Sequence, residues 1–165
     1  MGEMKKQAPG GGGRRMGHNF TSLLTHVIFS TKDRVPSIKP GFKADLHAFL
    51  GGIIRKMDGK AVVVNGTNDH VHLLLWMPPA VSVSETMRVL KSNSSRWVNQ
   101  KGVAKPAFSW QTGYGAFSVS HSSTAAVVKY IQGQEEHHRR VSFQEEFVTF
   151  LKKHGVEYDE RYIWE

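Results

Sequence analysis

The sequence contains no cysteine and no long hydrophobic run, and each absence excludes a class of protein. Without cysteine, its 165 residues can form no disulfide scaffold, no Cys-ligated zinc site and no thiol nucleophile. The longest apolar runs, such as residues 73–77, are far shorter than the ~20 residues that a membrane-spanning helix requires. We therefore expect no transmembrane helix and no membrane partner.

The composition is that of a globular protein with a basic charge balance. Hydrophobic residues make up 39% of the chain and charged residues 22%, which argues against wholesale disorder. The formal net charge is +8. Such an excess suits a polyanionic partner, most simply a nucleic acid, but it is also unremarkable for an ordinary basic protein. Charge alone leaves both interpretations open.

The first residues differ in composition from the rest. Residues 1–18 combine a glycine run, Gly10–Gly13, with basic pairs on both sides, and they offer little to bury. We predict a flexible, basic, glycine-rich leader there, without the apolar centre of a signal peptide. Residues 19–165 are close to the length of one ordinary domain and predict a single domain.

Periodicity in that domain alternates between the patterns of strands and helices. Apolar, β-branched runs predict strands over residues 20–31, 61–64, 70–77, 108–110 and 114–120, with Asn65-Gly66 as a hairpin turn. Helical spacing predicts helices over residues 42–57, 82–97, 123–134 and 142–154, with capping boxes at Ser82 and Ser142. The order predicts an α+β fold, namely a ferredoxin-like β-α-β-β-α-β sandwich with an antiparallel sheet and additional C-terminal helices.

Two histidines on a predicted strand form the first candidate site. In His70-Val71-His72 the two imidazoles point to the same face, because strand side chains alternate. Two imidazoles on one face can hold a divalent metal ion, and Asp69 before them could orient a ligand or simply end the turn. Two structural histidines would give the same pattern, so this motif alone decides little.

A second pair, Tyr130 and Gln134, has the i, i+4 spacing that makes neighbours on a helix. Tyr130 offers a hydroxyl nucleophile, and Gln134 offers an amide oxygen that suits a hard cation such as Mg²⁺ or Mn²⁺. Taken singly, a packed tyrosine and a solvated glutamine are the more ordinary interpretations. His137 and His138 follow on the same helix, as DNA-contacting or proton-transferring groups or as a packed pair.

Several segments together resemble one protein family, the single-domain HUH tyrosine transposases. These comprise the insertion-sequence 200/605 (IS200-like) group and the related REP-associated tyrosine transposases. The resemblance is carried, in order along the chain, by residues 68–75 (NDHVHLLL), 90–97 (LKSNSSRW), 110–120 (WQTGYGAFSVS), 130–138 (YIQGQEEHH) and 142–146 (SFQEE). It extends from about Phe20 to Trp164.

The resemblance implies a function and assigns roles to the motif residues. Tyr130 would be the nucleophile, and His70, His72 and Gln134 would bind the metal ion, Mg²⁺ or Mn²⁺. The implied enzyme cleaves and rejoins single-stranded DNA through a 5′-phosphotyrosine, recognises hairpin-bearing ends, and works as a homodimer. The family is known for a tyrosine helix that exchanges between the subunits of a dimer, and the sequence leaves open whether catalysis here is in cis or in trans. The implied enzyme would act at the nucleoid in a prokaryotic cytoplasm. Gly133 departs from the asparagine that such proteins often carry.

Basic side chains near these motifs are candidates for phosphate contacts. We single out Lys91, Arg96 and Lys129, although each could equally be a solvated charge. Two other functions stay open: a domesticated REP-associated relative with the same nicking chemistry, and a non-catalytic nucleic-acid-binding module on the same fold. No general base for Tyr130 is evident from the sequence.

Overall fold

The computed structural model describes residues 20–164, so the predicted leader, residues 1–18, lies outside the described residues. The elements are β1 (Leu24–Ser30), η1 (Lys32–Arg34), α1 (Pro40–Lys56), β2 (Lys60–Gly66), β3 (His70–Trp76), α2 (Val83–Lys101), β4 (Gly115–Val119), η2 (His121–Ser123), α3 (Thr124–Gln132), α4 (Gln134–His137) and α5 (Phe143–Lys153). None of the helices described is long and apolar enough to cross a membrane.

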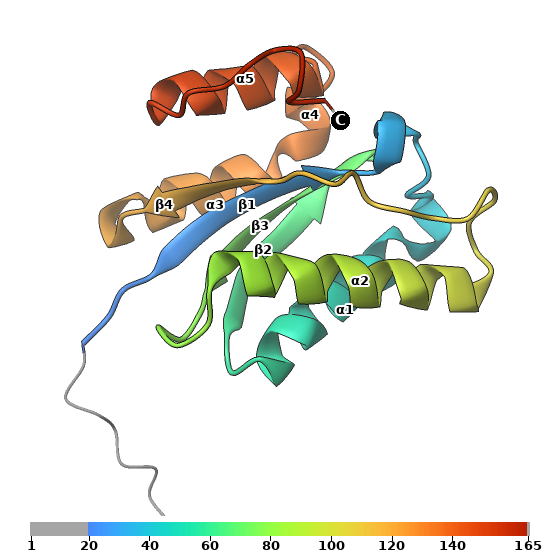
Figure 1. Ribbon diagram of the computed structural model, residues 1–165, viewed down its shortest axis with the longest axis horizontal. Coiled ribbons are helices and arrows are strands. Elements are labelled where there is room, and N and C mark those ends of the chain that lie inside the picture. Colours follow the sequence, from blue (N-terminus) through green and yellow to red (C-terminus); the bar gives the residue numbers. More distant parts are fainter. Residues whose placement is uncertain (1–19, 165) are drawn as a thin grey trace, which may run out of the picture.

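The four strands form one sheet in the order β2-β3-β1-β4, and every neighbouring pair is antiparallel. The connections through α1 and α2 return over the same face of the sheet, while α3, α4 and α5 lie over the opposite face (Figure 1). This is the predicted ferredoxin-like sandwich with additional C-terminal helices, and the prediction of an α+β fold is confirmed.

The alternation of β3 decides which side chains face which helices. Val71, Leu73 and Leu75 belong to the main hydrophobic cluster under α1 and α2. His70 and His72 have the opposite parity, so they point to the face that α3, α4 and α5 cover. Both faces of β3 are buried, and the two histidines are therefore held inside the protein.

Three local predictions were wrong. Asn65 and Gly66 end β2 instead of forming the hairpin turn, which lies over residues 67–69. A Cβ on Gly66 would lie 2.1 Å from the His70 carbonyl oxygen, so glycine is required there by close packing. Residues 108–110 contribute only an isolated bridge between Thr31 and Trp110.

The third difference concerns the helix that carries Tyr130. It ends at Gln132, and α4 begins at Gln134, with Gly133 between them at φ −86° and ψ 11°. The ψ of Gly133 departs from the helical value by about 50°, yet Tyr130 and Gln134 still lie on the same side of the chain, because both contact Glu146 Oε1. The predicted single helix is thus divided at the glycine that interrupts it.

The C-terminal segment covers the sheet face that bears the histidines. The capping box at Ser142 is present, with Glu145 as its partner, and it starts α5. Phe143 and Leu151 of α5 pack with Ile28 and Phe117 of the sheet, and Trp164 of the tail packs against this cluster. Helix α5 and the tail up to Trp164 therefore cover this face of the sheet.

Candidate active site

His70 and His72 lie side by side on β3, and both are almost completely buried. Their ring centroids are 5.2 Å apart. Backbone alternation brings them together, as the sequence predicts, and burial keeps bulk water away from both rings. The site is built outward from this pair.

Each of the two rings has a partner that orients it. His70 Nδ1 lies 2.7 Å from Asp69 Oδ1 and 2.9 Å from the Thr67 hydroxyl, so its Nε2 points into the site. His72 Nδ1 lies 3.0 Å from Nε2 of His26 on β1. Such contacts to the far nitrogen are how proteins set the orientation of histidines that bind metal ions. The role that the sequence suggested for Asp69 matches this geometry.

A buried carboxylate from α5 lies beside the histidines. Glu146 Oε2 is 3.3 Å from His72 Nε2 and 3.1 Å from His138 Nε2. Its other oxygen, Oε1, accepts a hydrogen bond from the Tyr130 hydroxyl and one of 3.1 Å from Gln134 Nε2. This single carboxylate therefore contacts both the histidine cluster and the tyrosine.

The electrostatics of the cluster favour an ionised Glu146 and uncharged inner histidines. Burial opposes ionisation of Glu146, but the hydrogen bond from His138, the adjacent His72 and the hydrogen bond from Tyr130 outweigh it and hold the pKa of this carboxyl well below its usual range. Burial lowers the pKa of His72 to about 4 and that of His26 to about 3. Neutral imidazoles are the form that binds metal ions.

Tyr130 reaches the site from α3, which is anchored to the edge of the sheet. The Asn65 amide on β2 donates hydrogen bonds of 2.9 Å to the Ile131 carbonyl and 3.0 Å to the Gln132 carbonyl. Burial, followed by the adjacent Glu146, raises the pKa of Tyr130 above its ordinary value. The phenol is therefore protonated until a reaction removes its proton.

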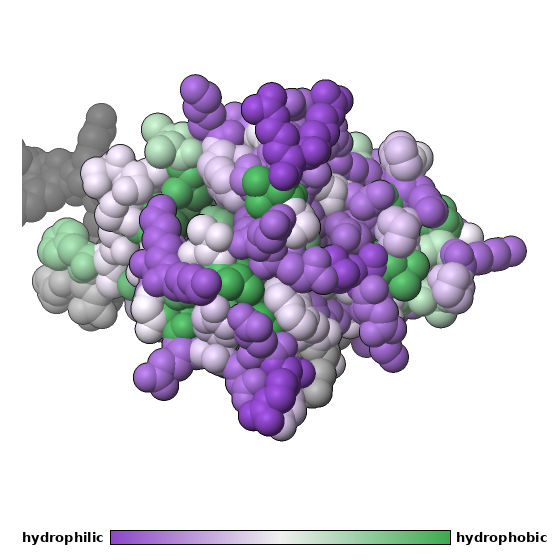
Figure 2. Space-filling model, turned by 90° about the horizontal axis from the view of Figure 1, so that it is seen from above, coloured by the Kyte–Doolittle hydropathy of each residue, from purple (hydrophilic) through white to green (hydrophobic). Residues whose placement is uncertain are grey.

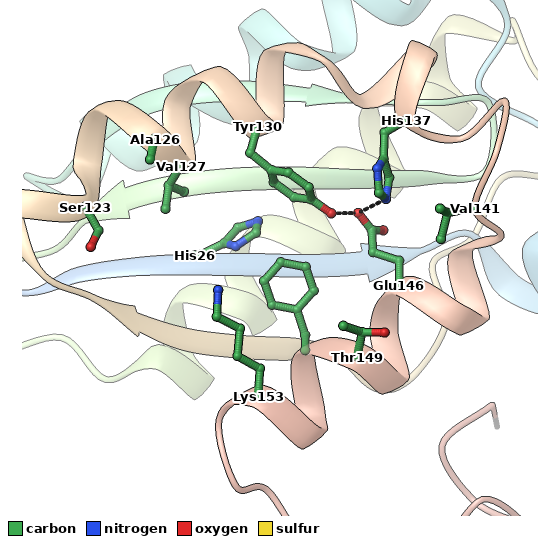
Figure 3. A pocket seen from close by; sticks show the side chains of 11 residues that line it. His26, Ser123, Ala126, Val127, Tyr130, His137, Val141, Glu146, Thr149 and Lys153 are labelled. Atoms are coloured by element: carbon green, nitrogen blue, oxygen red, sulfur yellow. Dashed lines mark hydrogen bonds and ion pairs between the residues drawn. The ribbon is translucent and has the colours of Figure 1, made fainter.

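A cavity of about 570 Å³ opens beside the tyrosine. In Figure 3, Tyr130 and His137 point toward the Glu146 carboxylate on one side of it, and His26 and Lys153 lie further along. The walls include Ala126 and Val141, so the space is mostly apolar apart from the polar groups around Tyr130. A substrate group placed here would lie next to the hydroxyl.

Gln134 and His138 point into the buried site, whereas His137 lies at the wall of the cavity. Gln134 is completely buried, and its Oε1 lies 3.5 Å from His70 Nε2. His138 is also turned inward, with Nδ1 2.8 Å from the Val141 carbonyl oxygen. Burial alone would lower the pKa of His138, but the hydrogen bond to Glu146 and its charge raise it. His137 lies 3.4 Å from Glu146 Oε1 at the wall of the cavity.

The side chains present fit a metal ion. Ligand atoms of His70, His72, His138 and Glu146 all lie within 4.8 Å of one another. The buried Nε2 of His72 has no hydrogen-bond partner and faces the Glu146 carboxylate instead. A nitrogen lone pair and an anionic oxygen that face one another are the donor set that a divalent cation prefers.

The three basic candidates lie at different distances from this site. Lys91 is on α2, across the sheet, and its ammonium donates to the Thr112 and Gly113 carbonyls at 2.8 Å each. Burial lowers the pKa of Lys91 to about 8. Arg96 is exposed on the same helix, whereas Lys129 is exposed on α3, directly before Tyr130.

The surface over α5 is suited to a polar partner. Figure 2 shows this face covered mainly by hydrophilic side chains, with hydrophobic ones in small separate areas. A polar face of this kind is compatible with a partner whose backbone is charged, as that of a nucleic acid is.

Comparison with known proteins identifies the family. The model of the family described as "Transposase IS200 like" matches residues 19–134. This chain belongs to the IS200-like transposase family. The transposase for insertion sequence element IS200 from Salmonella typhimurium is 29% identical over 132 residues, which cover 74% of this chain and 84% of that protein. The ISDra2 transposase TnpA from Deinococcus radiodurans is 26% identical over 122 residues, covering 69% and 85%.

A solved structure shows the same fold. A REP-associated tyrosine transposase bound to a REP hairpin superposes on this IS200-like transposase with a TM-score of 0.56 and 14% identity, covering 76% of each chain. The predicted resemblance to this family is thus confirmed. The stretch matched by the family model contains His70, His72, Tyr130 and Gln134 but ends before His138 and Glu146. The last two belong to the part of the chain beyond that match.

Proposed function

We propose that this transposase cleaves and rejoins single-stranded DNA with Tyr130 as the nucleophile and a divalent metal ion at His70, His72 and Gln134. One observation carries the proposal: the Tyr130 hydroxyl and the buried histidines converge on the same carboxylate, Glu146. An isolated structural tyrosine has no need of such a cluster.

The metal ion, when bound, supplies positive charge that neutralises the phosphate oxygens and stabilises the charge that develops during transfer. The protein's own groups supply the nucleophile and hold it in place. Tyr130 attacks phosphorus in line with the leaving 3′ oxygen, so an O–P bond to the tyrosine forms as the P–O3′ bond breaks. The phenol proton leaves by way of the site and the solvent, and the departing oxygen takes up a proton to become a 3′-OH.

Glu146 has a defined place in this step. The pKa of Tyr130 is raised, so its proton must be accepted as the O–P bond forms. Glu146 Oε1 already accepts the hydrogen bond from that hydroxyl. The carboxylate thereby holds the phenol in a fixed direction and with a fixed orientation of its proton.

The proposed DNA partner has hairpin-bearing ends, as the family resemblance implies, and the relative that carries a REP hairpin supports this choice. The proposed assembly is a homodimer that acts at the nucleoid in the cytoplasm. Lys129, exposed beside the nucleophile, is the basic candidate best placed for a phosphate contact. Lys91 and Arg96 would contact DNA from across the sheet.

The test is a denaturing-gel assay with labelled single-stranded DNA from the flanks of the gene, in the presence of Mg²⁺ or Mn²⁺. Wild type and Tyr130→Phe run beside Tyr162→Phe, whose exposed tyrosine lies far along the tail. We expect an SDS-resistant protein–DNA adduct that needs metal, persists in Tyr162→Phe and disappears in Tyr130→Phe. Retention of DNA without metal and without adduct, identical in all three proteins, would instead establish a binding module.

A further inference from the structure

A fourth and a fifth side chain reach the space that His70 and His72 share. His138, at the end of α4, and Glu146, on α5, come from the part of the chain beyond the family match. Their facing atoms, Nε2 and Oε2, are 3.1 Å apart. Glu146 is 3% exposed, and the His138 side chain is 11% exposed. Neither is therefore an ordinary solvated group.

The hydrogen bonds behind these rings show which atoms face inward. His138 Nδ1 lies 2.8 Å from the Val141 carbonyl, which can only accept, so this nitrogen carries hydrogen. His138 Nε2 faces the Glu146 carboxylate and donates a hydrogen bond to it while the ring is protonated; once that proton is lost, the lone pair of Nε2 points at the carboxylate. His70 repeats the arrangement, since Nδ1 faces the Asp69 carboxylate and Nε2 faces the Gln134 Oε1 at 3.5 Å.

When both rings are neutral, as metal binding requires, two pairs of hydrogen-bond acceptors face one another across one buried space. Such pairs repel unless a positive centre lies between them. A divalent cation removes both repulsions at once, and it also gives a partner to the Nε2 of His72. Metal–ligand bonds of ~2.1 Å bring atoms on opposite sides of an ion within ~4.2 Å. The observed spread of 4.8 Å needs only a small contraction.

We propose that His138 and Glu146 bind the metal ion together with His70 and His72, beside Gln134, and that this ligand set selects a first-row transition-metal ion over Mg²⁺. The inference rests on the proposed function, which supplies the ion but assigns only three ligands. Imidazoles suit transition metals, whereas Mg²⁺ prefers an all-oxygen environment and keeps several waters. Three imidazoles therefore disfavour Mg²⁺.

The arrangement gives Glu146 two tasks. Oε2 faces the ion with His72 and His138, while Oε1 holds the Tyr130 hydroxyl. One carboxylate thereby links the position of the ion to that of the nucleophile. Binding of the ion and orientation of the phenol are coupled through a side chain that the family match does not contain.

The test measures metal binding rather than cleavage. Full-length chain, freed of metal by a chelator, is titrated calorimetrically with Mn²⁺ and separately with Mg²⁺. We expect wild type to bind Mn²⁺ at least about tenfold more tightly than Mg²⁺. Glu146→Gln and His138→Gln should each weaken Mn²⁺ binding by at least about tenfold, since even groups behind a ligand contribute that much. Glu145→Gln is the matched control, because glutamine also serves in a capping box.

A second measurement needs no variant. Pulsed electron paramagnetic resonance of the Mn²⁺-loaded wild type counts the imidazole nitrogens on the ion, and we expect three. Two nitrogens, or unchanged Mn²⁺ affinity in both Glu146→Gln and His138→Gln, would overturn the inference. If His70→Gln still abolishes binding in that case, the three-ligand site of the proposed function stands. If the wild type binds neither Mn²⁺ nor Mg²⁺, both this inference and the three-ligand metal site of the proposed function are wrong.

Discussion

Nε2 of His26 on β1 lies 3.0 Å from Nδ1 of His72 on β3, and this contact joins the centre of the sheet to the site. Both rings are buried, and no other strand lies between them. When His72 Nδ1 donates to His26, the Nε2 of His72 is left with a lone pair directed at the proposed metal position. In the proposed site, His26 therefore positions a ligand and is not itself one.

Replacing His26 by phenylalanine keeps a ring of similar size and removes the nitrogen that faces His72. We expect Mn²⁺ affinity to fall by about 10- to 100-fold, as is typical when the partner of a metal-bound histidine is lost. Calorimetric titration of the metal-free protein measures the change. His121→Phe, an exposed site before α3, is the control. Equal affinities in the two variants would leave His26 as a core residue only.

Gly133→Ala tests whether the interruption between α3 and α4 is needed. At φ −86° alanine is allowed, and its Cβ would contact the Lys129 and Tyr130 carbonyls at 3.5 and 3.7 Å, which is ordinary packing. We expect the free energy of unfolding to rise by about 0.4–1 kcal/mol, because the unfolded chain loses freedom. Urea unfolding measures it. Gly102→Ala, at φ +65°, should destabilise the protein instead.

Mixing two inactive variants tests which subunit supplies the nucleophile. Tyr130 contacts Glu146 of its own chain, and Asn65 anchors its helix to its own sheet. We therefore expect cleavage within one subunit. Co-expressed Tyr130→Phe and His72→Gln should form no more DNA adduct than either variant alone. Adduct recovered in the mixture would mean that the tyrosine helix exchanges between subunits.

As the pH falls, the metal-free protein should begin to lose stability at a pH well above the usual pKa values of carboxyl groups. Burial lowers the pKa of His26 to about 3 and that of His47 to about 4. Below pH ~6.5 these two histidines therefore bind protons in the unfolded chain but stay unprotonated in the folded chain. Stability is therefore complete above this pH and is lost as the pH falls toward 4. His138, with a raised pKa, keeps its contribution throughout this window.

Urea unfolding at pH 7.5 and pH 5 measures this loss. We expect His26 alone to account for about 2 kcal/mol at pH 5. His47→Gln, outside the site on α1, should make the dependence on pH shallower. A free energy of unfolding that is the same at both pH values would contradict the expected charge states.

Much of the fold was predictable because its signals are local. The alternation around His70 and His72 indicated both the strand and their shared face. The serines at 82 and 142 indicated the starts of α2 and α5, and both hydroxyls accept the expected hydrogen bond. The Asn65-Gly66 turn was wrong because strand pairing overrode a dipeptide preference, and the close approach of the His70 carbonyl explains the glycine.

The missing part of the site depends on tertiary contacts. Glu146 follows a capping glutamate, and nothing in its neighbours distinguishes it from a solvated residue until α5 packs against the sheet. His26 lies in an apolar strand, and an imidazole at a buried position of that strand was the available signal. From the sequence, His138 was one of two adjacent histidines with no feature to separate them. Its inward direction depends on the change in chain direction at Gly133, where α4 begins.

An exposed serine steadies the turn of backbone that carries a buried carboxylate. Ser142 caps α5, and Glu146 comes four residues later, at the end of the first turn. The packing of Phe143 and Leu151 against the sheet fixes which way the helix faces, and the cap keeps its first turn wound. A surface change at position 142 would therefore loosen the backbone beneath Glu146 without touching any group that contacts Tyr130 or the histidines.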